Sequence, residues 1–269
     1  MILVGVDGSQ AGLEAVGWAA REAALREVPL MVAHAMPKWA YETETDRYAE
    51  VARWLREGGR SVLAAAEQRA RREEPKITVD TAFLADDPRA ALITAAKEAE
   101  LLVVGSHGIG GFRGMLVGSV AHGVAGHAPC DVVVVRGLPS LPRGEIVVGI
   151  DGSPASARVL EFAFAEARLR GARLRAVHAT SYAQPGRAAL DEVSEVTWPS
   201  AGWHADVALV EEVVHGHPVE VLRQAAGGAD LLVVGSHGHG AFAGMVLGSV
   251  SQELLQQSPC PLVVVRSAR

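Results

Sequence analysis

The chain is poor in aromatic residues and in cysteine. Phe, Trp and Tyr together make up 5% of its 269 residues, while apolar residues as a whole make up 49%. A core built mainly on aromatic rings is therefore excluded, and tightly packed layers of strands and helices are favoured. The two cysteines, Cys130 and Cys260, each follow a proline at matching repeat positions. We interpret them as packing residues of separate domains and not as a disulfide.

A net positive charge and long apolar runs are also missing. The formal net charge is −6, which gives no overall electrostatic attraction for nucleic acid or for an anionic membrane surface. No uninterrupted apolar run is long enough to span a bilayer. The apolar run at the start is broken by Asp7 and follows no basic segment, which argues against a signal peptide. We therefore expect a cytoplasmic protein.

What the chain does contain is one glycine-rich phrase, present twice. Residues 105–119 are GSHGIGGFRGMLVGS and residues 235–249 are GSHGHGAFAGMVLGS, each after an apolar run that ends in Leu-Leu-Val-Val. The spacing is Gly-x2-Gly-x9-Gly-Ser in both copies. Glycines between a strand and a helix start leave backbone amides accessible, and such amides hold phosphate. The duplicated phrase therefore predicts a duplicated nucleotide-binding module.

The repeat extends over nearly the whole chain. The opening ILVGVDGS at 2–9 matches IVVGIDGS at 146–153, and the final strand of each copy ends in Val-Val-Val-Arg. A Pro/Gly-containing segment separates the copies, as linkers commonly do. We therefore expect two domains, 1–137 and 145–269, joined by a linker at 138–144.

Strands alternate with helices in each copy, and the strands are continuously apolar, as buried parallel strands are. In the first copy we expect strands at 2–6, 29–35, 77–84, 101–105 and 131–136. Helices are expected at 11–27, 44–72, from Pro88 to Glu98, and at 117–127. In the helix 11–27 we expect inward positions at Leu13, Val16, Ala20, Ala24 and Leu25. In the second copy we expect a helix that starts with Ser153 as its cap, directly followed by Pro154. We also expect little helix within 182–204 and a last strand at 262–266.

Three repeated features fall at the carboxyl ends of predicted strands, where open parallel sheets bind ligands. Asp7 and Asp151 end the first strands and can accept ribose hydroxyls. Ala35 and Ala179 end the second strands, where backbone groups can contact an adenine edge. The glycine phrase follows the fourth strands and can hold phosphates at a helix N-terminus. Together these features outline an adenine nucleotide. His34 and His178 are interpreted as packing residues of the second strands.

These residues resemble the ATP-binding subgroup of the universal stress proteins, in its tandem-domain form. The similarity lies in the GVDGS and GIDGS openings, the histidine of the second strand, and G-x2-G-x9-G-S before a helix. The resemblance implies an α/β fold of two Rossmann-like (adenine nucleotide alpha hydrolase-like) domains, each a five-stranded parallel sheet flanked by helices. It also implies one ATP per domain, with or without Mg2+, pairing of the domains through 131–136 and 262–266, a homodimer and a regulatory protein partner.

The resemblance assigns equivalent cofactor-binding residues to the two copies. In the first copy they are Gly5, Asp7, Ala35, Gly105, Gly108, Gly118, Ser119 and Val120. In the second copy they are Gly149, Asp151, Ala179, Gly235, Gly238, Gly248, Ser249 and Val250. The first copy departs from the family pattern twice: it has Asp86 where the second has Gly216, and Ala121 where the second has Ser251. We still expect both sites to bind nucleotide.

The glycine phrase lacks the lysine of a Walker loop, and the chain has no protein-kinase signature. No catalytic residue is therefore assigned, and no metal site, because no cysteine or carboxylate cluster completes the histidines of the second copy. We expect an ATP-binding, nucleotide-dependent stress-response regulator with at most weak ATPase activity. The alternatives are a slow ATP-hydrolysing enzyme and a scaffold that binds no ligand.

Overall fold

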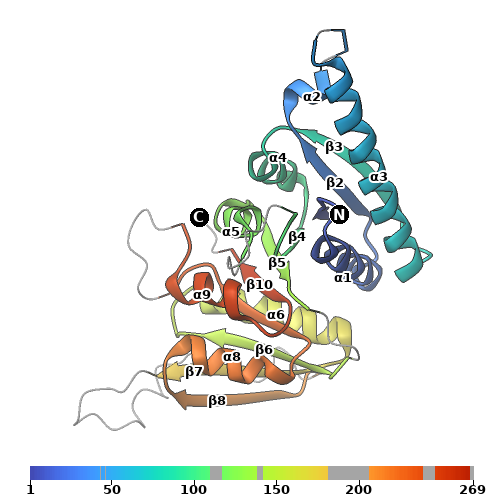
Figure 1. The fold of residues 1–269 in the computed structure, drawn as a ribbon. Coiled ribbons are helices and arrows are strands. Elements are labelled where there is room, and N and C mark those ends of the chain that lie inside the picture. The colour runs from blue at the N-terminus through green and yellow to red at the C-terminus, as the bar shows by residue number, and fades with distance from the viewer. Residues whose placement is uncertain are drawn as a thin grey trace. The chain divides into compact units, whose positions relative to one another are not determined.

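The computed structural model describes residues 1–42, 44–45, 47–109, 117–137, 142–180, 206–238 and 246–266. The chain divides into two compact units, Met1–Arg136 and Gly137–Arg269 (Figure 1). The described part of each unit is a parallel five-stranded sheet with flanking helices, which confirms the predicted α/β class. No helix in these described ranges has the length and apolar character to cross a membrane.

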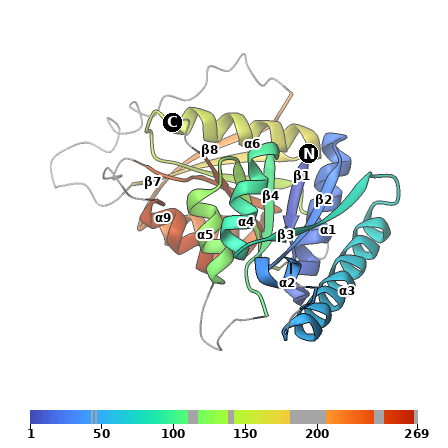
Figure 2. The same cartoon turned by 90° about the horizontal axis from the view of Figure 1, so that it is seen from above.

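Unit 1 has the strand order β3-β2-β1-β4-β5. The strands are β1 (Ile2–Gly5), β2 (Leu30–Met36), β3 (Val79–Ala85), β4 (Leu101–Gly105) and β5 (Asp131–Val135). The helices are α1 (Gln10–Arg26), α2 (Lys38–Glu42), α3 (Ala49–Glu73), α4 (Pro88–Ala95), which continues into the 3-10 turn η1 (Ala96–Glu98), and α5 (Ser119–His127). The helices α1 and α3 cover one face of the sheet, and α4 and α5 cover the other (Figure 2).

Unit 2 repeats this order as β8-β7-β6-β9-β10. Its strands are β6 (Glu145–Ile150), β7 (Arg173–Thr180), β8 (Leu209–His215), β9 (Leu231–Gly235) and β10 (Leu262–Val265). Its helices are α6 (Ser156–Arg170), α8 (Pro218–Ala225), which continues into η2 (Ala226–Gly228), and α9 (Ser249–Gln257).

The central strands form the core because helices cover both of their faces. The Leu-Leu-Val-Val run that precedes each glycine phrase is buried in β4 and in β9. Burial of one such side chain stabilises the fold by roughly 1.5–3 kcal/mol. In unit 1, β2 and β3 are added on one side of β1, and β4 and β5 are added on its other side; unit 2 repeats this around β6. The carboxyl ends of β1 and β4, and of β6 and β9, therefore border a crevice at the point of reversal.

Three details of the helices differ from the sequence expectations. The long helix expected at 44–72 is present as α3, but it begins only at Ala49, after Tyr48, a residue without a side-chain cap bond. The short helix α2 precedes this range and was not expected. The helix expected at Pro154 begins at Ser156. Leu25 is 40% exposed, because the inward face of α1 runs through Val16, Ala20 and Ala23 and leaves Leu25 outside it. The predicted loop at 182–204 lies outside the described residues.

Candidate functional site

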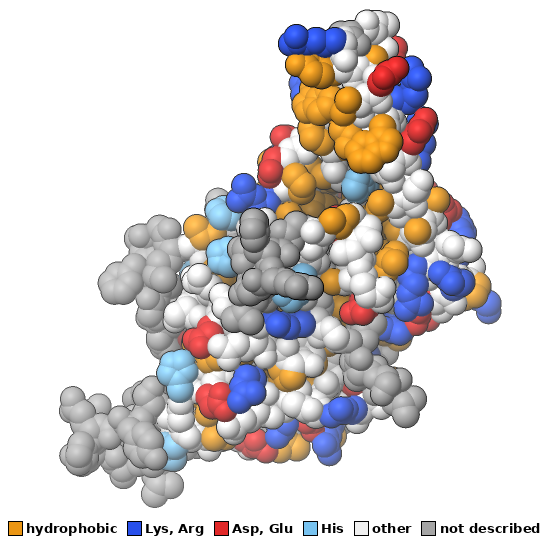
Figure 3. All heavy atoms as spheres, viewed as in Figure 1, with side chains coloured by type: hydrophobic (Ala, Val, Ile, Leu, Met, Phe, Trp, Pro, Cys, Tyr) orange, Lys and Arg blue, Asp and Glu red, His pale blue; other side chains and the backbone are white. Residues whose placement is uncertain are grey.

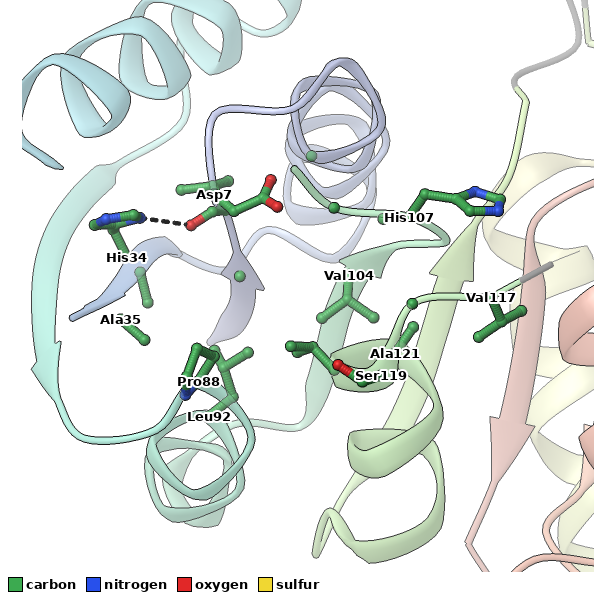
Figure 4. Close-up of a pocket in the computed structure, with 18 residues that line it drawn as sticks. Asp7, His34, Ala35, Pro88, Leu92, Val104, His107, Val117, Ser119 and Ala121 are labelled. Carbon is green, nitrogen blue, oxygen red and sulfur yellow. Dashed lines mark hydrogen bonds between the residues drawn. The ribbon is translucent and has the colours of Figure 1, made fainter. Parts of the chain in front are cut away.

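A pocket of about 280 Å3 lies in the crevice of unit 1, at the carboxyl ends of β1 and β4 (Figure 4). Glycines and apolar side chains form most of its wall. All eight residues assigned from the sequence to the first site line it: Gly5, Asp7, Ala35, Gly105, Gly108, Gly118, Ser119 and Val120.

A second pocket, of about 200 Å3, occupies the equivalent place in unit 2. The eight residues assigned to the second site all line it: Gly149, Asp151, Ala179, Gly235, Gly238, Gly248, Ser249 and Val250. Each unit thus brings its opening strand and its glycine phrase together around one cavity, although the two segments are about a hundred residues apart in sequence.

The carboxylate of Asp7 lies against the start of the glycine loop. Its Oδ1 accepts a hydrogen bond from the Ser9 amide at 3.0 Å, and its Oδ2 accepts one from the Ile109 amide at 2.8 Å. A Cβ at Gly108 would collide with this same Oδ2. Gly108 is therefore needed for Asp7 to hold the loop, and the carboxylate remains at the wall of the pocket.

In unit 2 the carboxylate of Asp151 has one partner, the Ser156 hydroxyl, that has no equivalent in unit 1. Its Oδ1 accepts hydrogen bonds from the Ser153 amide and from the Ser156 hydroxyl, both at 3.0 Å. The first copy has Gly12 at the position of Ser156, so this hydroxyl bond has no counterpart there. A Cβ at Gly238 would collide with Asp151 Oδ2, as at Gly108 in unit 1.

The N-termini of α5 and α9 border the two pockets. Gly118 and Gly248 precede these helices and provide no side-chain cap. The amides of the following Ser-Val pair therefore lie at an uncapped helix start, where the helix dipole favours an anion. Ser119 and Ser249 add a hydroxyl to each pocket wall.

An apolar wall, which the sequence reasoning did not assign, faces this polar rim. In unit 1 it includes Val6, Pro88, Leu92, Val104 and Val117 (Figure 4). A flat heterocycle is suited to such a wall, because ligand pockets commonly pair apolar walls with a few directed polar groups. The signal for Leu92 was present in the sequence as the apolar position of the helix that follows Pro88.

The histidines of the second strands do more than pack. The His34 ring contacts the Val6 carbonyl through Nδ1 at 2.8 Å, and it lines the first pocket. The His178 ring makes the matching contact with the Ile150 carbonyl at 3.0 Å. The interpretation of His34 as a packing residue alone was therefore incomplete.

Two positions that departed from the family pattern have structural consequences. Ser251 donates a hydrogen bond to the Gly235 carbonyl at 2.5 Å, which ties the start of α9 to the end of β9. Ala121 cannot make this bond in unit 1. Gly216 has a φ of +152°, a value that favours glycine, and Asp86 replaces it in the first copy. The rims of the two pockets thus differ, although their core residues are the same.

No lysine or arginine is present among the described residues that line the two pockets. The groups that these residues offer to a phosphate are amides, hydroxyls and the helix dipole. The described ranges also contain no group of three or more His, Cys, Asp or Glu side chains placed to hold a metal ion.

Comparisons with known proteins agree with one another on the family. The model of the universal stress protein family matches residues 1–136 and 143–266. The universal stress protein Rv2623 of Mycobacterium tuberculosis is 35% identical over 292 aligned residues, which cover 99% of this chain and 96% of that protein. The crystal structure of a universal stress protein from Archaeoglobus fulgidus is 21% identical, has a TM-score of 0.73, and matches over 99% of this chain and 96% of its own. A universal stress protein solved in complex with cAMP is 32% identical over 50% of this chain and 95% of its own, with a TM-score of 0.41.

Proposed function

Because the chain belongs to the universal stress protein family, we propose that each of its two units binds one ATP molecule, with or without Mg2+. The proposal rests on one observation above all. In both units an aspartate, a glycine-rich loop and an uncapped helix start border a single pocket with an apolar wall.

The pocket walls match the three parts of an adenine nucleotide. The apolar wall around Leu92 suits the base, and the Asp7 carboxylate can accept hydrogen bonds from ribose hydroxyls. The amides of Ser119 and Val120 and the Ser119 hydroxyl suit the phosphates. Leu222, Asp151 and Ser249 line the second pocket in the same roles. A bound Mg2+ would be coordinated mainly by the phosphates and water, as is usual for that ion.

The nucleotide is proposed to act as a regulatory ligand of a cytoplasmic stress-response protein. Without a lysine among the described lining residues, the pockets favour holding ATP over transferring its terminal phosphate. Bound nucleotide would stabilise one arrangement of the glycine loop through its contacts there, and a protein partner would respond to that arrangement. We propose that the chain acts as a homodimer.

Denaturing the purified protein and chromatographing the supernatant tests the proposal. We expect adenine nucleotide in the supernatant, or ATP binding by calorimetry after the protein has been stripped of ligand. If neither is found, the ligand-free scaffold is the correct alternative. Phosphate release from ATP well above background, reduced by Gly118→Val and abolished by Gly118→Val together with Gly248→Val, would instead identify an ATP-hydrolysing enzyme.

A further inference from the structure

Exposed aromatic side chains gather at the α2–α3 end of unit 1, where Figure 3 shows a cluster of hydrophobic surface. Trp39 and Tyr41 belong to α2, Tyr48 precedes α3, and Val51 and Trp54 lie on its first turns. These five residues, the aromatic patch, are 45–71% exposed, and Trp54 is the most exposed. The chain has five Trp and three Tyr, so half of these residues lie within residues 39–54.

The patch continues along α3 as a stripe without charge. The stripe consists of Val51, Trp54, Gly58, Ser61 and Ala65, which follow one another at spacings of three and four residues. All five are exposed. The solvent side of a surface helix normally carries charged and polar residues. The stripe lies on the side of α3 away from its buried residues, which are Ala52, Gly59, Leu63, Ala66 and Ala70.

Resting on the homodimer of the proposed function, we propose that its two copies meet through this stripe, with the two α3 helices packed antiparallel. The stripe has its large side chains in its first half, at Val51 and Trp54, and small ones in its second half, at Gly58, Ser61 and Ala65. An antiparallel two-fold pair places the large half of each helix on the small half of the other. The spacing of three and four residues is that of a helix-pair seam, and a two-fold contact uses the same surface of both copies.

Charge placement supports the same arrangement. When Trp54 faces Ala65 of the second copy, antiparallel positions shift in opposite directions, so Glu50 lies opposite position 69 of that copy and about 3 Å along the helix axis from its Arg71. Residues 38–57 contain four basic and five acidic residues. A nucleic acid or an anionic membrane would therefore meet at least as many carboxylates as cations on this surface. A surface that carries both signs suits a partner with the same mixture.

The exposed area is sufficient for a modest interface. An aromatic side chain offers about 150–250 Å2, so the four aromatic residues at their exposed fractions offer roughly 300–550 Å2 per copy. If the second copy covers the aromatic patch together with the stripe, the two copies bury roughly 600–1,100 Å2 from the aromatic residues, and the later turns of α3 bring the total toward the ~1,200 Å2 at the lower end of stable interfaces. Trp, Tyr and Arg are also the residues enriched in interface cores.

Sedimentation velocity on the full chain, from about 1 to 100 μM, tests the proposal. We expect a dimer for the natural chain and a monomer for Trp54→Glu at the same concentrations. Val210→Glu is the matched control, because Val210 is also an exposed apolar residue, at 43%, but belongs to β8 of unit 2. The control should remain dimeric. Circular dichroism and nucleotide binding should be unchanged in both variants, which separates the α3 contact from the proposed ATP binding.

A charge exchange tests the antiparallel register. Glu50→Arg and Arg71→Glu should each weaken the dimer by roughly 3–10-fold, and the two changes together should restore it. The double variant decides the test, because Arg71 also pairs with Glu67 of its own helix at 2.9 Å. A natural chain that stays monomeric throughout, a Trp54→Glu chain that still dimerises, or a double variant weaker than both single ones would overturn the proposal. Retention of a monomeric chain by phosphatidylglycerol vesicles, lost in Trp54→Glu, would overturn it in favour of a membrane surface.

Discussion

Gly105, Gly108 and Gly118 belong to one phrase, but a side chain at each would meet a different neighbour. A Cβ at Gly105 would lie 2.7 Å from backbone atoms of Ala11, and one at Gly108 would strike the Asp7 carboxylate. Among the described residues, a Cβ at Gly118 would meet nothing closer than 3.5 Å, and the φ of −69° there suits any residue. The first two glycines are required by the fold itself, whereas the third leaves room in the pocket.

Gly105→Ala should therefore destabilise the protein, and Gly118→Ala should not. We expect a loss of about 1–3 kcal/mol at Gly105, because the backbone of α1 must move to accept the methyl group. At Gly118 the change should stay within about 0.5 kcal/mol. Urea unfolding of the two variants measures the difference. Equal losses would show that the close approach of β4 to α1 is not tight.

The two cysteines should differ in reactivity. Burial raises the pKa of the Cys260 thiol to about 12, whereas Cys130 is half-buried. At pH 8 only about one Cys260 in 10,000 would be thiolate. Iodoacetamide should label Cys130 first and Cys260 only after unfolding, as mass spectrometry of the peptides can show. Labelling of native Cys260 first would contradict this account.

The same shift gives the stability a pH dependence. The pKa of the Cys260 thiol is higher in the folded than in the unfolded protein, so any stability from this thiol is lost as pH rises from about 9 to about 12.

At the scale of elements, the same opening phrase starts its helix differently in the two copies. In unit 1 the Ser9 hydroxyl accepts a hydrogen bond from the Gly12 amide at 3.0 Å and caps α1, which begins at Gln10. In unit 2 the Ser153 hydroxyl oxygen is buried and has no hydrogen-bond partner within the described part of the chain. The Ser156 hydroxyl bonds Asp151 instead, and α6 begins at Ser156.

Ser9→Ala should cost about 1 kcal/mol, the usual value of a lost N-cap. Ser153→Ala should change the free energy of unfolding by less than about 0.5 kcal/mol, because its hydroxyl makes no bond that would be lost. Thermal or urea unfolding compares the two single variants. A larger loss at Ser153 than at Ser9 would contradict the difference in capping.

The sequence predicted the sheets better than the helix starts, for physical reasons. Apolar runs such as 101–105 coincide with β4, because a strand buried on both faces requires them. The start of α6 depends on a competition between Ser153 and Ser156 for nearby groups, which no local pattern decides. The start of the long helix was expected five residues too early, because Glu44 and Arg47 continue its charged composition, whereas α3 begins at Ala49. The polar residues of both pockets could be predicted because they lie at the carboxyl ends of predicted strands. Most of the apolar wall could not be predicted in this way.

At the scale of the whole molecule, each pocket is lined by residues of its own unit. The described lining residues of the first pocket run from Gly5 to Ala121, and those of the second run from Gly149 to Ser251. Unit 1 ends at Arg136, between these two sets. Since the two pockets share no described lining residue, ATP should bind to them independently.

The predicted pairing of the final strands, 131–136 with 262–266, stays a prediction from the sequence. If these strands pair within one chain, small-angle scattering from monomeric Trp54→Glu should give the radius of gyration of one compact particle, about 18–19 Å for 269 residues. A clearly larger radius, with the profile of two separated bodies, would contradict the pairing.

Calorimetric titration of ligand-free protein with ATP tests the central claim most directly. We predict two ATP per chain for the natural protein, one for Gly118→Val, one for Gly248→Val and none for the double variant, because a valine would fill the pocket without disturbing the fold. Loss of all binding from a single substitution, or two ATP still bound by the double variant, would contradict the account.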